Sequence, residues 1–368
     1  MTISMIEHTE PGDLVTHQRN FKQKLEDVVE NLQITPDLTI SYRDREPVTI
    51  ESHLHGYLNQ ISLVDRNRYL ATKLQKYLYS IFSSDSQPQN TKADQEATNY
   101  VNKWSRTKFY QQLLQHNQGK GYSDPDWLVV KQEANYWQVT KNDLTLHIQL
   151  EKHLVESREE LHPGELVAIK MPPNLVDRGF YIAVGDSGSV NAAINAADSP
   201  EESITTQIYF NVNAAGALVL VDNLTRELNA REISFDFRVA YDETKFDHLD
   251  SAVLNFKSSD FELIYPIVNN AYQKNQSYFQ SKVPFFCQPL APGLGLAEKP
   301  RSPTYQQKNI GQYYCGMIAT AIVEKWQEDG LTGNKLADVL NYLSLAEVDI
   351  EHLYLNPNST KSYQAEIV

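Results

Sequence analysis

The sequence is poor in cysteine, and this shortage excludes a fold built on disulfides. Its 368 residues contain two cysteines, Cys287 and Cys315, and these form no pair with metal-ligand spacing. A reduced, cytoplasmic setting fits this count best. Each cysteine lies in an apolar stretch, where buried free cysteine is common, so a structural thiol is favoured and a catalytic thiol is the alternative.

Positive charge is also scarce. The chain has 47 acidic against 33 basic residues and a net charge of −14, which argues against nonspecific nucleic-acid binding, because that binding needs a cationic surface. One local exception stands out. Residues 281–312 carry four basic residues against one acidic residue, and an anionic ligand would need such an exception.

Long apolar runs and the local signatures of several enzyme classes are missing as well. No run of about 18 apolar residues could cross a bilayer, and the first ten residues do not have the pattern of a secretory signal. Walker A, His-Glu-x-x-His and Gly-x-Ser-x-Gly motifs are absent. His53 and His55 lie two apart on a predicted helix, so they point to different faces. We therefore expect no metal, no cofactor and no membrane partner.

Hydrophobic periodicity divides the chain. Residues 14–32 and 53–82 have helical spacing, which predicts an N-terminal helical region over residues 1–82. Residues 83–98 offer almost nothing to bury and predict a polar linker or mobile insertion. From residue 127 onward, short β-branched and aromatic segments bounded by turn residues predict strands. The expected fold is α+β, with a mixed, largely antiparallel sheet and packed helices over residues 99–368.

One predicted strand, residues 233–239, alternates strictly. The alternation buries Ile233, Phe235, Phe237 and Val239, because successive side chains of a strand point to opposite faces. Ser234, Asp236 and Arg238 are left on the opposite face. Arg238 is thus predicted to be an outward cation on a rigid element, a better platform for a site than a loop.

Residues 283–298 form an apolar run that is punctuated by breakers. The breakers are Pro284, Pro289, Pro292, Gly293 and Gly295. Proline fixes φ and glycine permits positive φ, so this segment predicts a packed loop with one backbone path and no regular helix or central strand. A structural connection and a functional loop are both consistent with it.

Residues from about 100 to 357 resemble the HopA-type family, named for a type III secretion effector of plant-pathogenic bacteria. The likeness is carried by Asp124-Pro-Asp-Trp127, Tyr209-Phe-Asn211, Phe235-Asp-Phe-Arg-Val239, Lys282-Val-Pro-Phe-Phe286 and Tyr354-Leu-Asn-Pro357. Its most specific piece is the run Pro-Leu-Ala-Pro-Gly-Leu-Gly-Leu-Ala-Glu over residues 289–298. Similar domains occur beside kinase-like proteins in bacterial lanthipeptide-type pathways, where they are assigned to eliminating phosphate from phosphoserine or phosphothreonine.

The resemblance implies a lyase that acts on a phosphorylated peptide beside a kinase-like partner. Such a reaction needs a base for the Cα proton, donors for the developing enolate and cations for the phosphate. The implied catalytic residues are Lys170, a base if its pKa is lowered, and Tyr313. The implied substrate-binding residues are Arg238, Tyr181, Asn211, Asp250, Gln288, Glu298, Lys299 and Arg301, with Lys308 in reserve.

Three positions depart from the family pattern. Relatives tend to have lysine where this chain has Gln288, and a histidine-arginine pair where it has Tyr313 and Tyr314. Glutamine cannot carry charge, and tyrosine replaces neither imidazole nor guanidinium. The alternative function is therefore a noncatalytic HopA-like module that binds a peptide or protein partner, either in its own cell or as an effector in a host.

Overall fold

The computed structural model describes residues 11–58, 60–83, 108–158, 160–177, 179–190, 204–301, 309–330, 333–357 and 359–363. A seven-stranded antiparallel sheet lies at its centre, in the order β12-β13-β9-β11-β10-β8-β7. The strands are β7 (Asn174–Asp177), β8 (Phe180–Val184), β9 (Thr205–Phe210), β10 (Phe235–Ala240), β11 (Ala252–Lys257), β12 (Gln288–Ala291) and β13 (Leu294–Glu298). The predicted α+β class with antiparallel strands and packed helices is confirmed.

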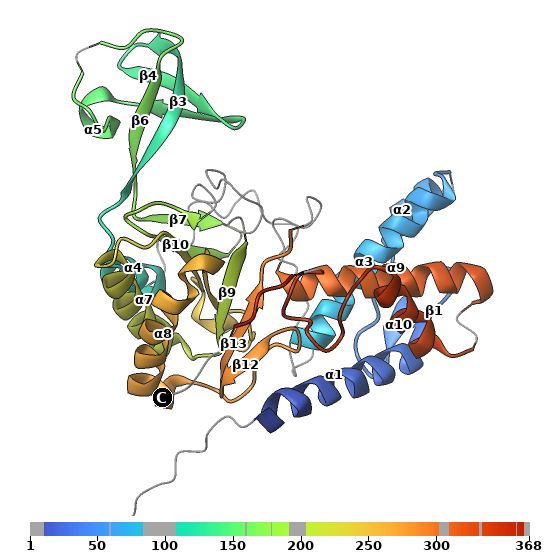
Figure 1. The fold of residues 1–368 in the computed structure, drawn as a ribbon. Coiled ribbons are helices and arrows are strands. Elements are labelled where there is room, and N and C mark those ends of the chain that lie inside the picture. Colours follow the sequence, from blue (N-terminus) through green and yellow to red (C-terminus); the bar gives the residue numbers. More distant parts are fainter. Residues whose placement is uncertain are drawn as a thin grey trace, which may run out of the picture.

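One face of this sheet is covered by helices. The helices are α4 (Lys108–His116), α7 (Ala214–Asn229) and α8 (Phe261–Asn275), which lie together beside the sheet in Figure 1. Phe235, Phe237 and Val239 of β10 are fully buried beneath them, as the alternation predicts. We call this the helix-covered face. Short 3₁₀ turns at Glu243–Lys245, Ser258–Asp260 and Gln276–Tyr278 complete the connections.

The N-terminal region is helical, as predicted, and packs with the C-terminal helices. Its elements are α1 (Pro11–Asn31), β1 (Leu32–Ile34), β2 (Ile40–Tyr42), α2 (Ser52–Leu58) and α3 (Leu63–Ser83). Helix α3 lies along α9 (Ile310–Asp329), and α1 contacts α10 (Lys335–Leu345) and β12. Most of the predicted linker, residues 84–98, lies outside the described residues, so the domain division at that segment stays a prediction.

The residues with helical spacing at 53–82 form two helices, because a new helix begins at Leu63. The hydroxyl of Ser62 accepts a hydrogen bond from the backbone N–H of Asp65 (3.1 Å) and donates to its carboxylate (2.7 Å). A serine that bonds to the third residue ahead is an N-cap, and it starts a helix rather than continuing one.

The strands that precede β7 form a second, separate sheet. Its order is β5-β4-β3-β6, with β3 (Tyr122–Glu133), β4 (Tyr136–Lys141), β5 (Leu144–Ile148) and β6 (Leu166–Met171), and with the short helix α5 (Leu150–His153) beside it. It has a small core of its own around Trp127 and Trp137. In Figure 1 it projects from one end of the central sheet.

The segment predicted as an irregular loop is a β-hairpin, and this prediction is wrong. Strand β13 pairs with β9 on one side and β12 on the other, so it is an interior strand. Pro292 and Gly293 form the turn between the two strands, and Gly293 has a positive φ of 76°. Pro289 is tolerated because β12 is the edge strand of the sheet. The breakers shape the turn and the edge rather than excluding strands.

Gly293→Ala is expected to lower the free energy of unfolding by about 3 kcal/mol or more. A Cβ at this position would lie 2.1 Å from the carbonyl oxygen of Gln280, in addition to the positive φ. Gly164→Ala is the matched control, since its φ is +96° but nothing lies within 4 Å of its Cβ position. Gly164→Ala should lower the free energy of unfolding, measured by urea titration, by about 1–2 kcal/mol, because only the left-handed backbone conformation is strained. Equal losses in the two variants would contradict the turn geometry.

Candidate functional site

The face of the central sheet opposite the helix-covered face carries a row of polar side chains. Asp236 on β10 stands opposite Asn255 on β11, which stands opposite Gln207 on β9. One row along, Arg238 stands opposite Val253, and Val253 stands opposite Tyr209. We call Gln207, Tyr209, Asp236, Arg238 and Asn255 the polar face.

A chain of hydrogen bonds runs across these three strands. The Tyr209 hydroxyl donates to Gln207 Oε1 (2.9 Å), and Gln207 Nε2 donates to Asn255 Oδ1 (2.7 Å). Asn255 Nδ2 then donates to the carbonyl oxygen of Asp236 (3.1 Å). All four residues are buried, and a buried polar network with paired members fixes the side chains in one arrangement.

Arg238 projects from this face without an acceptor for its donors. Its guanidinium stacks on the Phe180 ring, 4.3 Å from the ring centroid. The side chain is half-buried, and within the described ranges it makes no hydrogen bond and no ion pair. A guanidinium has five N–H donors in a fork that matches carboxylate and phosphate oxygens. The arrangement is that of an anion receptor.

Lys299 brings a second cation to the same face. Its backbone N–H donates to the carbonyl oxygen of Thr205 (2.8 Å), which continues the pairing of β13 with β9 by one residue. The side chain is half-buried. Burial lowers the pKa of its ammonium group, the Asp236 carboxylate opposes this shift, and the Arg238 charge adds to it. Arg238 and Lys299 therefore face the same carboxylate.

Asp236 lies between these cations and is 7% exposed. The Ser189 hydroxyl donates to its Oδ2 (2.8 Å). Burial raises the pKa of this carboxyl to about 6, although the Ser189 hydrogen bond and the charges of Lys299 and Arg238 lower it. Sequence periodicity placed Asp236 on this face but did not identify it as a site residue.

Asp236 is expected to make the protein less stable as pH rises from about 4 to about 6. The unfolded carboxyl loses its proton near 3.8, whereas the folded one keeps it to about 6, so the folded state binds more protons in this window. The linkage relation converts the difference into roughly 3 kcal/mol. Asp236→Asn should be more stable than the wild type by up to that amount above pH 6 and equally stable below about pH 4. Urea unfolding across this range checks it, and parallel pH profiles would contradict it.

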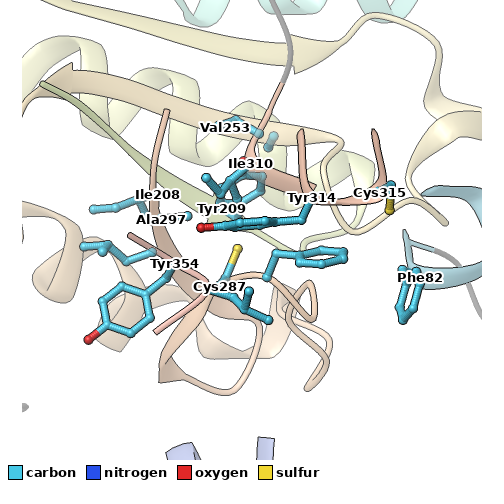
Figure 2. Close-up of a cluster of buried hydrophobic side chains, with 14 of the residues drawn as sticks. Phe82, Ile208, Tyr209, Val253, Cys287, Ala297, Ile310, Tyr314, Cys315 and Tyr354 are labelled. Carbon is cyan, nitrogen blue, oxygen red and sulfur yellow. The ribbon is translucent and has the colours of Figure 1, made fainter. Parts of the chain in front are cut away.

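A small pocket adjoins Tyr209 where α3, α9 and the hairpin meet. Tyr79 of α3 donates to the Asp250 carboxylate, and Asn309 Nδ2 donates to the Tyr79 hydroxyl (2.6 Å). Cys287 lines the same pocket, and Figure 2 shows it below Tyr209 and Tyr314. Both cysteines are free and buried, and burial raises the pKa of both thiols. This favours the structural thiol over the catalytic one.

Three of the substrate-binding residues implied by the resemblance lie on the helix-covered face. Tyr181 is fully buried, and its hydroxyl accepts a hydrogen bond from Asn117 Nδ2 (2.9 Å). Gln288 stands opposite Leu296, and its Nε2 donates to the carbonyl oxygen of Tyr363 (3.4 Å). Glu298 is fully buried and accepts hydrogen bonds from the C-terminal segment. The structure does not bring these three together with Arg238.

The remaining implied residues are spread more widely. Asn211 donates to the carbonyl oxygen of Lys282 (2.8 Å), and the Arg301 N–H donates to Asn356 Oδ1 (3.0 Å). Lys170 is exposed on β6 of the separate sheet. Tyr313 is half-buried in the first turn of α9, with its ring against Tyr314. Lys308 lies outside the described residues. Of the implied set, the structure brings Arg238 and Lys299 together, with Asp250 beside Tyr209.

The described ranges contain no group of three or more histidine, cysteine, aspartate or glutamate residues placed to hold a metal ion. No helix in them is long and apolar enough to cross a membrane.

The fold is α+β, and two cationic side chains, Arg238 and Lys299, lie on one face of its central sheet. The model of the HopA1 effector protein family matches residues 171–355, which is half of the chain. The chain therefore belongs to the HopA1 effector protein family, and the resemblance seen in the sequence is confirmed. The matched span contains β8 to β13, and thus every residue of the polar face.

Two solved structures are similar to the chain. One is the effector protein from Pseudomonas syringae pv. tomato strain DC3000, with 14% identity, a TM-score of 0.43, and coverage of 93% of this chain and 97% of that chain. The other is the effector protein from Pseudomonas syringae pv. syringae strain 61, with 14% identity, a TM-score of 0.42, and coverage of 79% and 93%. No curated protein matches the chain.

Proposed function

We propose that the polar face binds the phosphoryl group of a phosphoserine or phosphothreonine in a peptide, and that the protein eliminates this group as a carbon-oxygen lyase. The observation that carries the proposal is Arg238, whose guanidinium has no acceptor among the described residues. Lys299 adds a second cation, and a pair of cations suits a phosphate dianion better than a single carboxylate.

The reaction follows from the chemistry of the bound group. A base removes the Cα proton, the electron pair of that bond forms the Cα–Cβ double bond, and the Cβ–O bond breaks. Phosphate leaves with the electrons of the broken bond. Arg238 and Lys299 stabilise the negative charge that develops on the departing phosphate, which is where fixed charges lower a barrier most. The products are a dehydroamino acid in the peptide and inorganic phosphate.

The proposal also sets the partner and the setting. The substrate must come from a reaction that phosphorylates a serine or threonine of a peptide, so a kinase-like protein is the expected partner. The cytoplasm, where a kinase finds its nucleotide, is the proposed place of the reaction.

Binding without reaction is the second candidate function. It is favoured by the position of Lys170, the base implied by the resemblance, which is exposed on a different sheet from Arg238. A polar face without that base would still hold a phosphopeptide.

Mass spectrometry on defined peptides tests the proposal. The pure protein is incubated with a panel of phosphoserine and phosphothreonine peptides of defined sequence, and with the same peptides unphosphorylated. The expected result is loss of phosphoric acid from the phosphorylated peptides alone. Binding of phosphopeptides with no loss supports the second candidate, and neither binding nor loss contradicts both.

A further inference from the structure

We infer that Asp236 is the general base that takes the Cα proton of the bound phosphoserine or phosphothreonine. The inference rests on the proposed function and names a catalytic residue for it. It replaces Lys170 in that role.

Asp236 and Arg238 lie on the same face of one strand. Asp236 and Arg238 are two residues apart on β10, so their side chains leave the same face about 7 Å apart along the strand. In the substrate, Cα is joined to phosphorus through Cβ and the ester oxygen, so the two ends of this chain of atoms lie three bonds apart. A phosphoryl group at Arg238 therefore sets the Cα of the same residue near Asp236. Because both groups are on one rigid strand, the spacing does not depend on a loop.

Hydrogen bonds hold the Asp236 carboxylate in one position. Ser189 Oγ and the backbone N–H of Val190 donate to it, and Asn255 Nδ2 donates to the carbonyl oxygen of the same residue. The bonds from Ser189 and Val190 fix the carboxylate, and the bond from Asn255 holds the backbone of the strand that carries it. A base that is held in place needs no reorganisation when the proton moves.

Charged and titratable groups surround the Asp236 carboxylate. Among the described residues, those that face it are Arg238 on its own strand, Lys299 beyond β13 and Tyr122 from β3. Burial raises its pKa to about 6, which leaves it ionised at neutral pH and more basic than an exposed carboxylate. A general base works best when its pKa lies near the working pH.

Lys299 is the competing base on this face, and its surroundings argue against it. A lysine must lose its proton before it can accept one, and the adjacent Asp236 carboxylate favours the charged ammonium. The ammonium is better suited to the phosphate or to the developing enolate oxygen. In the step proposed here, the proton moves from Cα to the Asp236 carboxylate, the Cα–Cβ double bond forms, and the phosphate departs to Arg238 and Lys299.

The test compares wild type, Asp236→Asn and Lys299→Arg on one phosphopeptide, with binding measured by anisotropy and elimination by mass spectrometry. Asp236→Asn should bind within about threefold of wild type and eliminate at least about 100-fold more slowly, the usual contribution of a general base. Lys299→Arg keeps the cation and should retain most of the rate. A rapid Asp236→Asn variant with an inactive Lys299→Arg variant would overturn the inference in favour of Lys299.

The outcomes separate the inference from the proposed function. If wild type and Asp236→Asn eliminate at similar rates, Asp236 is not the base and the lyase stands. If the wild type eliminates phosphate from no peptide, the proposed lyase activity is wrong, and the proposed role of Asp236 is wrong with it. If Asp236→Asn does not fold, the pH profile of the wild type decides. The kcat at saturating peptide should rise with pH through a midpoint near pH 6 and then level off. A flat profile would overturn the inference. Phosphoserine also titrates near pH 6, so the pH dependence of binding is measured separately.

Discussion

Arg238→Ala is expected to weaken binding of a phosphoserine peptide roughly 100-fold, since each hydrogen bond to a charged group contributes about 1.5–3 kcal/mol. The guanidinium has no acceptor among the described residues, so its removal breaks no hydrogen bond or ion pair there and loses the stacking on Phe180. The melting temperature should therefore stay within a few degrees of wild type. Calorimetric titration with the phosphopeptide and a thermal melt check both parts.

Two further variants separate the effect of the guanidinium group at this position from the effect of positive charge in general. Arg238→Lys keeps the charge but loses the planar fork, and we expect an affinity loss of roughly tenfold. Arg231→Ala removes an exposed arginine that pairs with Glu227 (2.7 Å), and affinity should be unchanged. If Arg231→Ala weakened binding as much as Arg238→Ala, long-range charge rather than a site would explain the effect. Unchanged affinity in Arg238→Ala would remove Arg238 from the site.

Glu298→Ala is expected to destabilise the protein by about 3–5 kcal/mol, because it breaks a buried hydrogen-bond network in which each donor left without an acceptor costs about 1–3 kcal/mol. Its Oε2 accepts from the N–H of Asn356 (2.8 Å) and from Asn356 Nδ2 (2.9 Å), and its Oε1 accepts from Ser359 Oγ (2.7 Å) and the Tyr363 hydroxyl (3.1 Å). Alanine would remove this acceptor from the buried N–H of Asn356 and from the Ser359 hydroxyl, whereas Asn356 Nδ2 keeps the Lys299 carbonyl oxygen and the Tyr363 hydroxyl keeps Thr206 and Ser258. Urea unfolding gives the loss directly.

Glu298→Gln is the control for this prediction. Glutamine keeps one carbonyl oxygen for Asn356, and its amide can donate to the hydroxyls of Ser359 and Tyr363, which act as donor or acceptor. We expect a loss of about 1 kcal/mol, as for one altered hydrogen bond. If Glu298→Ala cost no more than this, the C-terminal segment would not depend on Glu298.

The departures from the family pattern have structural positions. Gln288 lies on the helix-covered face, so a substitution there leaves the composition of the polar face unchanged. Tyr314 is buried, and its hydroxyl donates to the carbonyl oxygen of Leu355 (2.6 Å). Burial raises the pKa of its phenol, so it serves as a neutral donor. Neither residue takes a place beside Arg238 and Lys299.

Local pattern predicted the strands at residues 205–212, 233–239 and 251–256, but not the order in which they pair. The alternation of residues 233–239 placed Asp236 and Arg238 on one face because period two depends on the strand alone. Pairing β9 with both β11 and β13 joins segments distant in the sequence, and no local pattern specifies it. Gln207 and Asn255 could not be assigned to the site without that strand order, and Lys299 was implied by the family resemblance rather than by local periodicity.

The prolines and glycines of the hairpin were identified correctly as residues that shape the backbone, but the irregular loop predicted from them was wrong. Pro292 and Gly293 were recognised as residues that set the backbone, but their place between two strands was not. A Pro-Gly pair is typical of a type II turn, where proline presets φ and glycine takes the positive φ. The apolar residues after it are buried because β13 lies inside a sheet, which follows from its long-range partner β9.

The most direct test of the account follows both products from one phosphopeptide. The wild-type protein and Arg238→Ala are incubated with a phosphoserine or phosphothreonine peptide of defined sequence. Phosphate is quantified by ³¹P NMR, and the mass of the peptide is measured by mass spectrometry. The account predicts that wild type releases phosphate and dehydroamino acid in equal amounts and that Arg238→Ala releases neither at a comparable rate. An unchanged phosphopeptide, or phosphate released together with the original serine or threonine, would contradict it.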